Sequence, residues 1–273
     1  MDPFDEVRAE IDPLRRAQRA GELITTYQQR STELARLRRA AIDELARNGA
    51  MSTEIARKLN LSKGRITQIR QTAPPAQRAF FGVGPVTVAL PLREVPGRLQ
   101  PMIASEDSRA SDMLRGLLER LSFQVETFGI PPDGRWTPRG DTVAICGPKS
   151  SRVTAEAIAS DPLLTFAPDD AGRWVITDRR TGAVYTSPLD DASSQGWTDI
   201  AYVARLPIAT GSILVIAGVH ALGSVGAVHY LTDHLPDVYG QVGTRNFSMV
   251  VRSSHDADEV ISSEAVMPAC PHE

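Results

Sequence analysis

The stretch Met51–Gln71, MSTEIARKLNLSKGRITQIRQ, decides how the rest of the chain is interpreted. Its pattern predicts two short helices separated by a sharp turn. Ser52 is placed to cap the first helix, and Asn60 is placed at the turn, where Asn tolerates a left-handed backbone better than most residues. The inner face of this first helix is expected to carry Ile55, Ala56 and Leu59.

The second helix of the stretch is expected to follow Ser62, which is a good helix cap, with Leu61 plugging the turn. Ile66 and Ile69 would form its inner face. Arg and Lys suit phosphate or guanine, Gln suits adenine, and Thr suits the thymine methyl group, so the outward residues predict a DNA-binding face. These residues are Ser62, Lys63, Gly64, Arg65, Thr67, Gln68, Arg70 and Gln71.

This pattern resembles the bacterial helix-turn-helix of sigma-factor region 4 and related transcription regulators. In that family a small residue packs the first helix against the second, as Ala56 would here, while Asn60 replaces the usual glycine of the turn. The resemblance implies that residues 62–71 enter the major groove of double-stranded DNA. Two alternatives stay open: a three-helix interaction module that never meets DNA, and a partner of the transcription apparatus.

The charge of the chain is divided unevenly. The net formal charge is -3, but residues 1–76 carry 14 Lys and Arg against 10 Asp and Glu, a balance of +4, and the remainder carries 16 against 23, a balance of -7. A basic head on an acidic body is typical of a DNA-binding module joined to a domain of another function.

The two cysteines, Cys146 and Cys270, are not spaced as metal ligands are, and two distant cysteines do not suggest a disulfide-stabilised fold. This favours a reducing, cytoplasmic location. The first ten residues, MDPFDEVRAE, are acidic and lack the apolar core of a secretion signal. Residues 212–231 are the only stretch that resembles a membrane span, but His220, His229 and several glycines interrupt it. No membrane association is therefore expected.

The N-terminal third is expected to divide into a helical extension over residues 1–30, broken at Asp12-Pro13, and a helix-turn-helix domain over residues 31–73. The supporting helix would run from Ser31 to Asn48. Its apolar face would comprise Leu34, Leu37, Ala41, Ile42 and Leu45. Pro74-Pro75 ends the motif and opens a linker over residues 74–85, and its Phe80-Phe81 pair is expected to dock against a domain. The extension could pair with a second copy, bridge to the C-terminal domain or lie on the surface. A homodimer is expected because two motifs on one operator multiply the affinity for DNA.

Beyond residue 86 the pattern alternates between apolar strands and helices. This favours a Rossmann-like α/β domain over residues 86–265, with a mostly parallel sheet and a β-hairpin insertion. The expected strands are 86–92, 123–128, 142–146, 163–166, 174–177, 183–186, 213–217 and 247–252, and the expected helices are 106–121, 151–159 and 224–239. Residues 266–273 are expected to form a disordered tail. The predicted fold is thus α+β with two domains.

Two loops follow strands of this sheet and are candidates for ligand binding, because ligands of α/β proteins bind at the carboxyl ends of strands. The candidate residues in the first loop are Gly147, Lys149, Ser150, Ser151 and Arg152, and those in the second are Gly218, His220, Gly223 and Ser224. Hydroxyls, cations and helix N-termini suit a nucleotide or another phosphate-bearing effector. Neither loop matches a P-loop or a dinucleotide fingerprint. Arg93, Glu94, Ser105, Glu106 and Asp107 could complete the pocket.

An enzyme remains the alternative. Ser224 lies between a strand and a helix, as a hydrolase nucleophile does, but Leu222 replaces the first glycine of that motif, so Ser224 is interpreted as a helix cap. A nucleotide- or NAD-processing enzyme with Glu94, Glu106 or Asp107 as its acidic residue is the more plausible enzyme. His229 and His234 are five residues apart, which is not the spacing of a helical zinc pair, and no metal is expected.

Overall fold

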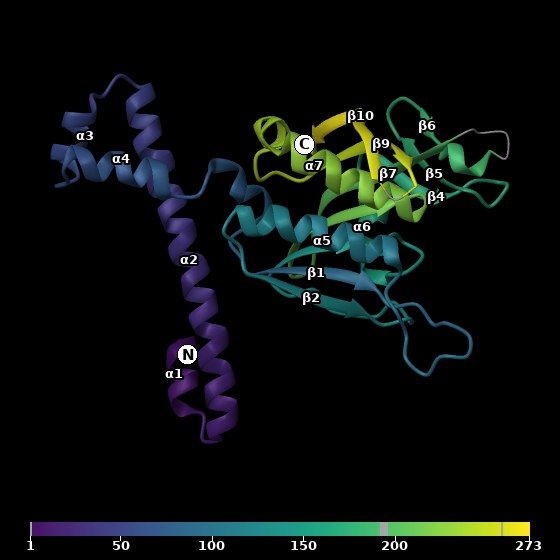
Figure 1. Ribbon diagram of the computed structural model, residues 1–273, viewed down its shortest axis with the longest axis horizontal. Coiled ribbons are helices and arrows are strands. Elements are labelled where there is room, and N and C mark those ends of the chain that lie inside the picture. Colours follow the sequence, from purple (N-terminus) through teal and green to yellow (C-terminus); the bar gives the residue numbers. More distant parts are fainter. Residues whose placement is uncertain (1, 192–195, 258) are drawn as a thin grey trace.

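The computed structural model describes residues 2–191, 196–257 and 259–273. Its N-terminal third is built on one long helix, α2 (Pro13–Arg47), which runs beside the short helix α1 (Pro3–Ala9) (Figure 1). The predicted break at Asp12-Pro13 is confirmed, since the Asp12 carboxylate caps α2 by accepting from the Leu14 amide. The predicted helix boundary at residue 31 is wrong. No proline interrupts residues 14–47, so the helix continues for 35 residues, or about 52 Å.

Two short helices, α3 (Ser52–Lys58) and α4 (Lys63–Thr72), pack against the C-terminal end of α2. Their shared core consists of Ile42, Ile55, Ala56, Ile66 and Ile69. Asn60 has a φ of 53°, the left-handed conformation expected at the turn. Two details of the prediction are wrong: Ser52 is already the first residue of α3 and caps nothing, and Leu59 is 41% exposed because it ends the helix beyond the core.

The apolar face predicted for the supporting helix is mostly not part of this core. Ile42 is buried, but Leu34, Leu37 and Leu45 are 65%, 48% and 42% exposed. α3 and α4 are too short to cover a face that extends along the middle of α2. An apolar strip of α2 therefore remains exposed in the part of the chain that the structure describes.

The segment that follows α4 joins the second half of the chain to the helical head, by which we mean α3, α4 and the end of α2 against which they pack. Its 3-10 helix, η1 (Ala76–Phe81), buries Phe80 and Phe81 against Phe247 and Phe123 respectively. This confirms the prediction that the two phenylalanines dock against a domain.

The second half of the chain forms a mixed seven-stranded sheet with the order β10-β9-β7-β8-β3-β1-β2. β2, β1, β3 and β8 are parallel, whereas β7, β9 and β10 continue the sheet with antiparallel pairings. The strands are β1 (Val86–Pro91), β2 (Val125–Ile130), β3 (Asp141–Ile145), β7 (Trp197–Ile208), β8 (Gly211–Gly218), β9 (Phe247–Asp256) and β10 (Glu259–Pro271). The fold is α+β.

The prediction of a mostly parallel sheet is wrong for the half that contains β7 and β10. β7 was not predicted from the sequence, because Asp199 and Arg205 interrupt its run of apolar residues. The tail predicted to be disordered instead completes β10, where Met267 and Ala269 are buried against the neighbouring strand β9. Its order comes from long-range pairing that a short, proline-containing sequence does not reveal.

Each face of the sheet carries its own apolar core. One face packs against α5 (Ser105–Arg120) and α7 (Ala221–Val242), and the other packs against α6 (Arg152–Ala159) and a small antiparallel sheet. That small sheet consists of β4 (Leu164–Pro168), β5 (Trp174–Asp178) and β6 (Val184–Tyr185), which confirms the predicted hairpin. A short 3-10 helix, η2 (Pro188–Asp190), precedes β7. None of the described helices is both long and apolar enough to cross a membrane.

Candidate functional site

The outward face of α4 carries the residues predicted to meet DNA, and all eight are exposed. The Ser62 hydroxyl caps the helix by accepting from the Arg65 amide at 3.1 Å, as expected. Ile66 and Ile69 point the other way, into the core of the head. The helix therefore presents one continuous polar and basic surface beginning at its N-terminus.

Two of these side chains already have partners within the chain. The Arg70 guanidinium lies 2.7 Å from the Asp43 carboxylate of α2, so it braces α4 against the supporting helix. Arg65 donates to the Gln68 side-chain oxygen at 2.7 Å, and both side chains remain on the exposed surface. Arg70 is thus less free to contact DNA than the sequence suggested, whereas Arg65 and Gln68 act as one unit.

A second candidate site is a cavity of about 220 Å³ at the carboxyl ends of β1, β3 and β8. Both predicted loops reach it, together with Phe166 and Trp174 from the small sheet. The predicted residues that line the cavity are Gly147, Lys149, Ser150, Gly218, His220 and Ser224. Both loops were predicted to follow strands of one sheet, and the sheet order brings them together because β3 and β8 are neighbours.

Three predicted ligand-binding residues do not line the cavity. The buried Ser151 hydroxyl caps α6 by accepting from the Thr154 amide, and it also accepts from the Trp136 indole. Arg152 is exposed outside the cavity. Gly223 has a packing role, since a Cβ atom there would lie 2.5 Å from the Ile200 carbonyl oxygen.

The N-terminus of α7 is occupied by a carboxylate from within the chain. Asp199, on β7, accepts hydrogen bonds from the Gly223 amide at 2.6 Å and the His220 amide at 3.1 Å, and from the Ser187 hydroxyl at 2.7 Å. Its charge lies at the positive end of the helix, where an anionic ligand was expected. Asp199 was not predicted as a site residue, because β7, the strand that carries it, was not predicted.

Ser224 has a different role from the predicted helix cap. It lies inside the first turn of α7, and its hydroxyl accepts from the Gly218 amide at 2.9 Å. This bond ties the end of β8 to the start of the helix. The amides of Gly218, His220 and Gly223 in the second loop are therefore already bonded to Ser224 or Asp199.

Charged and aromatic side chains face one another around the cavity. The Lys149 ammonium lies 4.9 Å from the centre of the Trp174 ring, and Arg93 is 3.0 Å from the Asp107 carboxylate. Burial raises the pKa of Asp107, although Arg93 opposes that shift. His220 lies 2.9 Å from the carboxylate of Asp190, a residue not predicted from the sequence to belong to the site. The cavity thus places a cation and two aromatic rings side by side, the types of group that hold a flat ring bearing a negative charge.

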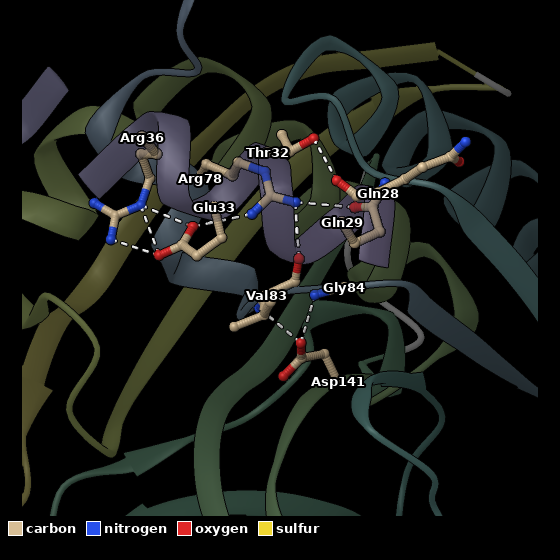
Figure 2. Close-up of polar contacts among 9 residues, drawn as sticks. All are labelled: Gln28, Gln29, Thr32, Glu33, Arg36, Arg78, Val83, Gly84 and Asp141. Carbon is tan, nitrogen blue, oxygen red and sulfur yellow. Dashed lines mark hydrogen bonds and ion pairs between the residues drawn. The ribbon is translucent and has the colours of Figure 1, made fainter. Parts of the chain in front are cut away.

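A buried cluster of polar side chains, which we call the clamp, joins α2 to the sheet domain (Figure 2). Arg78 of η1 is fully buried and donates to Gln29 at 2.9 Å and to Glu33 at 3.1 Å, and both of these residues belong to α2. Its guanidinium also lies over the Phe123 ring at 3.9 Å and donates to the Val83 carbonyl at 2.8 Å. Glu33 is held from its other side by Arg36.

The clamp continues into the sheet through Asp141, the first residue of β3. Its carboxylate accepts from the amides of Val83 and Gly84, each at 2.7 Å. Gly84 has a φ of 88°, and a Cβ atom there would lie 2.6 Å from the Gln29 side-chain oxygen. β1 and β3 thus begin at the clamp, and the cavity lined by Lys149 and Trp174 lies at their far ends.

Among the described residues, no group of three or more His, Cys, Asp or Glu side chains is arranged to hold a metal ion. Comparison of the chain with protein-family models and with curated proteins gives no match.

Proposed function

We propose that this protein is a sequence-specific DNA-binding transcription regulator whose sheet domain senses a small molecule. The observation that carries the proposal is α4, which buries Ile66 and Ile69 and turns a continuous polar and basic face outward from a capped N-terminus. A helix of this kind, braced by a preceding helix across a tight turn, is the geometry with which helix-turn-helix proteins read the major groove. The positive balance of the first 76 residues supports attraction to phosphate.

The proposed effector is a small molecule bearing a negative charge and a flat ring, such as a nucleotide. Lys149 would contact its charge, and Trp174 and Phe166 would contact its ring. Because Asp199 occupies the α7 terminus, we favour a ligand with one anionic group near Lys149 over one that needs two helix termini. Binding would act on α2 through β1 and β3, which connect the cavity to the clamp.

Two copies bound side by side would present two α4 helices to successive turns of the major groove. Such pairing raises affinity and sets the spacing of half-sites. A homodimer is therefore part of the proposed function.

The DNA-binding proposal is tested with the double variant Arg65→Ala and Gln68→Ala. DNA fragments selected from a random library by the wild-type protein should bind the double variant at least about 30-fold more weakly, because it loses two base contacts that each contribute about 1–3 kcal/mol. Arg15→Ala is the matched control, since Arg15 is exposed and lies at the far end of α2. Unchanged sequence-specific binding by the double variant would refute the assignment.

The sensor proposal is tested by thermal unfolding in the presence of inorganic phosphate, AMP, ATP and NAD. A compound that binds the cavity should raise the melting temperature of the wild-type protein, and Lys149→Ala should remove that increase. Arg152→Ala provides the control, because Arg152 is exposed on the neighbouring turn but does not line the cavity. An increase that survives in Lys149→Ala would place the ligand elsewhere.

A second candidate function is an enzyme that processes a nucleotide or NAD, with the helical head used for assembly or DNA binding. The specific observation in its favour is Asp107, a buried carboxyl at the cavity whose raised pKa suits a general acid. Incubation of the protein with these compounds, followed by chromatography, separates the candidates: turnover that Asp107→Asn abolishes favours the enzyme, and recovery of intact compounds favours the sensor.

A further inference from the structure

We propose that a second cavity, at the opposite end of the sheet from the first, binds a small monocarboxylic acid through Arg205. The cavity has a volume of about 200 Å³ and lies between η1 and the starts of β3 and β8. We call it the joint cavity, because Asp141 of the clamp forms part of its wall. The proposal goes beyond the sensor site around Lys149, which shares no lining residue with the joint cavity.

Arg205 belongs to a row of residues that crosses the sheet beneath η1. It pairs with Phe247 of β9 on one side and with Leu214 of β8 on the other, and Leu214 in turn pairs with Val143 of β3. Directly paired residues of neighbouring strands point to the same face of a sheet. The Arg205 guanidinium lies 4.8 Å from the centre of the Phe80 ring, so it projects into the space between the sheet and η1.

The Arg205 guanidinium is a buried cation among apolar side chains. Arg205 is 7% exposed, and burial lowers its pKa to about 10. It donates to the carbonyl oxygens of Arg245, at 3.1 Å, and of Phe80, and within the described chain it forms no ion pair with a carboxylate. A planar carboxylate, which accepts two parallel hydrogen bonds from a guanidinium, is the partner that this group lacks.

The charges of the clamp and the joint cavity together leave one positive charge unbalanced. Three guanidinium groups are buried there, those of Arg36, Arg78 and Arg205. Two carboxylates oppose them, those of Glu33 and Asp141. Glu33 is already shared by the first two arginines, and Asp141 accepts from two backbone amides (Figure 2). A ligand with a single negative charge would therefore restore the balance at Arg205.

The walls of the joint cavity favour a small carboxylic acid over phosphate. Asp141 lines the cavity, and its repulsion increases with the charge of a ligand, so inorganic phosphate is disfavoured. Phe80, Val143 and Leu214 line the cavity as well and suit a short apolar chain. The volume of about 200 Å³ is below the roughly 300 Å³ at which sites for drug-sized ligands begin.

A carboxylate in the joint cavity lies between the two sides of the connection that holds α2. Arg205 belongs to the sheet, whereas Phe80 belongs to η1, the segment whose Arg78 binds α2. Occupancy should therefore strengthen the packing of η1 on the sheet. The ligand can enter from solvent, because Ser212 and Thr244 line the cavity and are exposed.

Isothermal titration calorimetry of the full-length protein with sodium butyrate, at constant ionic strength, tests the proposal. We expect one site with a dissociation constant of about 1 mM. Butyramide, which has a similar shape but no charge, should bind at least about 10-fold more weakly, and so should inorganic phosphate. Absence of butyrate binding at about 10 mM, or binding of either other compound as tight as that of butyrate, would overturn the proposal.

The variant Arg205→Met should weaken butyrate binding at least about 10-fold, because it removes the charged donor. Arg139→Met is the matched control, since Arg139 is exposed and does not line the cavity. It should bind butyrate like the wild-type protein. Circular dichroism verifies folding, and a folded Arg205→Met that binds butyrate normally would refute the role of Arg205.

A second pair of variants decides the case in which Arg205→Met does not fold. Ser212→Trp places a large ring at an exposed lining position and should block butyrate, whereas Thr210→Trp, in the exposed turn before β8 and outside the cavity, should not. Equal binding by these two variants would overturn the proposal. Lys149→Ala should bind butyrate normally, and loss of binding there would assign butyrate to the first cavity. The sensor and DNA-binding proposals are unaffected by a negative result, because neither depends on Arg205.

Discussion

Arg78 and Glu33 are 45 residues apart in the chain, and their side chains meet at 3.1 Å in the contact between η1 and α2. Arg78 is fully buried, and burial lowers its pKa while the Glu33 carboxylate opposes that shift. A buried charge is stable only while its partners remain in place. The position of α2 on the sheet domain therefore depends on this pair.

Replacing Arg78 by Met should lower the free energy of unfolding by about 3–5 kcal/mol, because it leaves the Glu33 and Gln29 oxygens without their buried donor. Urea denaturation measures the loss. Arg173→Met is the control, since the Arg173–Asp169 pair is exposed to solvent and screened by it, so its loss should change the unfolding midpoint much less. Equal losses in the two variants would contradict a special role for the clamp.

Gly84→Ala should be more destabilising than Gly49→Ala, although both glycines have a φ near 90°. The added Cβ at Gly84 would lie 2.6 Å from Gln29 and 2.8 Å from Phe123, whereas the space around Gly49 is open. We expect about 1 kcal/mol for Gly49→Ala from backbone strain alone, and at least twice that for Gly84→Ala. Thermal unfolding of the two variants gives the comparison, and similar melting temperatures would rule out a steric contribution at the clamp.

Ser62→Ala should cost about 1 kcal/mol, since it removes the hydroxyl that accepts from the Arg65 amide at the start of α4. Ser52→Ala serves as its control, because Ser52 belongs to the neighbouring helix and makes no cap, so its effect should stay within about 0.5 kcal/mol. Chemical denaturation followed by circular dichroism distinguishes the two. Indistinguishable unfolding midpoints would mean that the cap does not stabilise α4.

Part of the pH dependence of stability should come from His255. Burial lowers its pKa in the folded protein, with the nearby charges of Arg109 and His229 acting in the same direction. A depressed pKa means that the unfolded chain binds the proton more readily, so this contribution is present above about pH 6.5 and is lost as the pH falls through the folded value.

His255→Gln should therefore lose less melting temperature than the wild-type protein between pH 7.5 and pH 5.5. Calorimetry at the two pH values measures the difference. Burial also lowers the pKa of His272, which adds a separate contribution to the pH dependence of stability. His272→Gln should remove that contribution. The same decrease in wild-type protein and in both variants would assign the pH dependence to other groups.

The local features of the head could be predicted from sequence, because they depend on neighbouring residues. Asn60 adopts the left-handed conformation that its position at the turn required, and Ser62 caps α4. The two loops of the cavity were also identified, since a turn after an apolar strand is a local pattern. Each of these features depends on only a few neighbouring residues of the sequence.

The features that the sequence did not reveal all depend on distant partners. The residues next to Arg78 in the sequence do not indicate that it will contact Glu33. Asp199 was not predicted, because a charged residue is not expected inside a buried strand. β10 acquires its order only by pairing with β9. Leu34 and Leu37 were assigned to a core because their spacing identifies an apolar face but not what covers it.

The length of α2 gives the molecule a mechanical property. The clamp holds the helix near Glu33, and the Asp43 contact to α4 lies ten residues further along, or about 15 Å at the helical rise. A rotation of about 10° at the clamp would move the head by about 3 Å, close to the spacing of consecutive base pairs. In the DNA-binding function that we propose, α2 would act as a lever, because a displacement too small to disturb the sheet would move α4 by about one base-pair step along the groove.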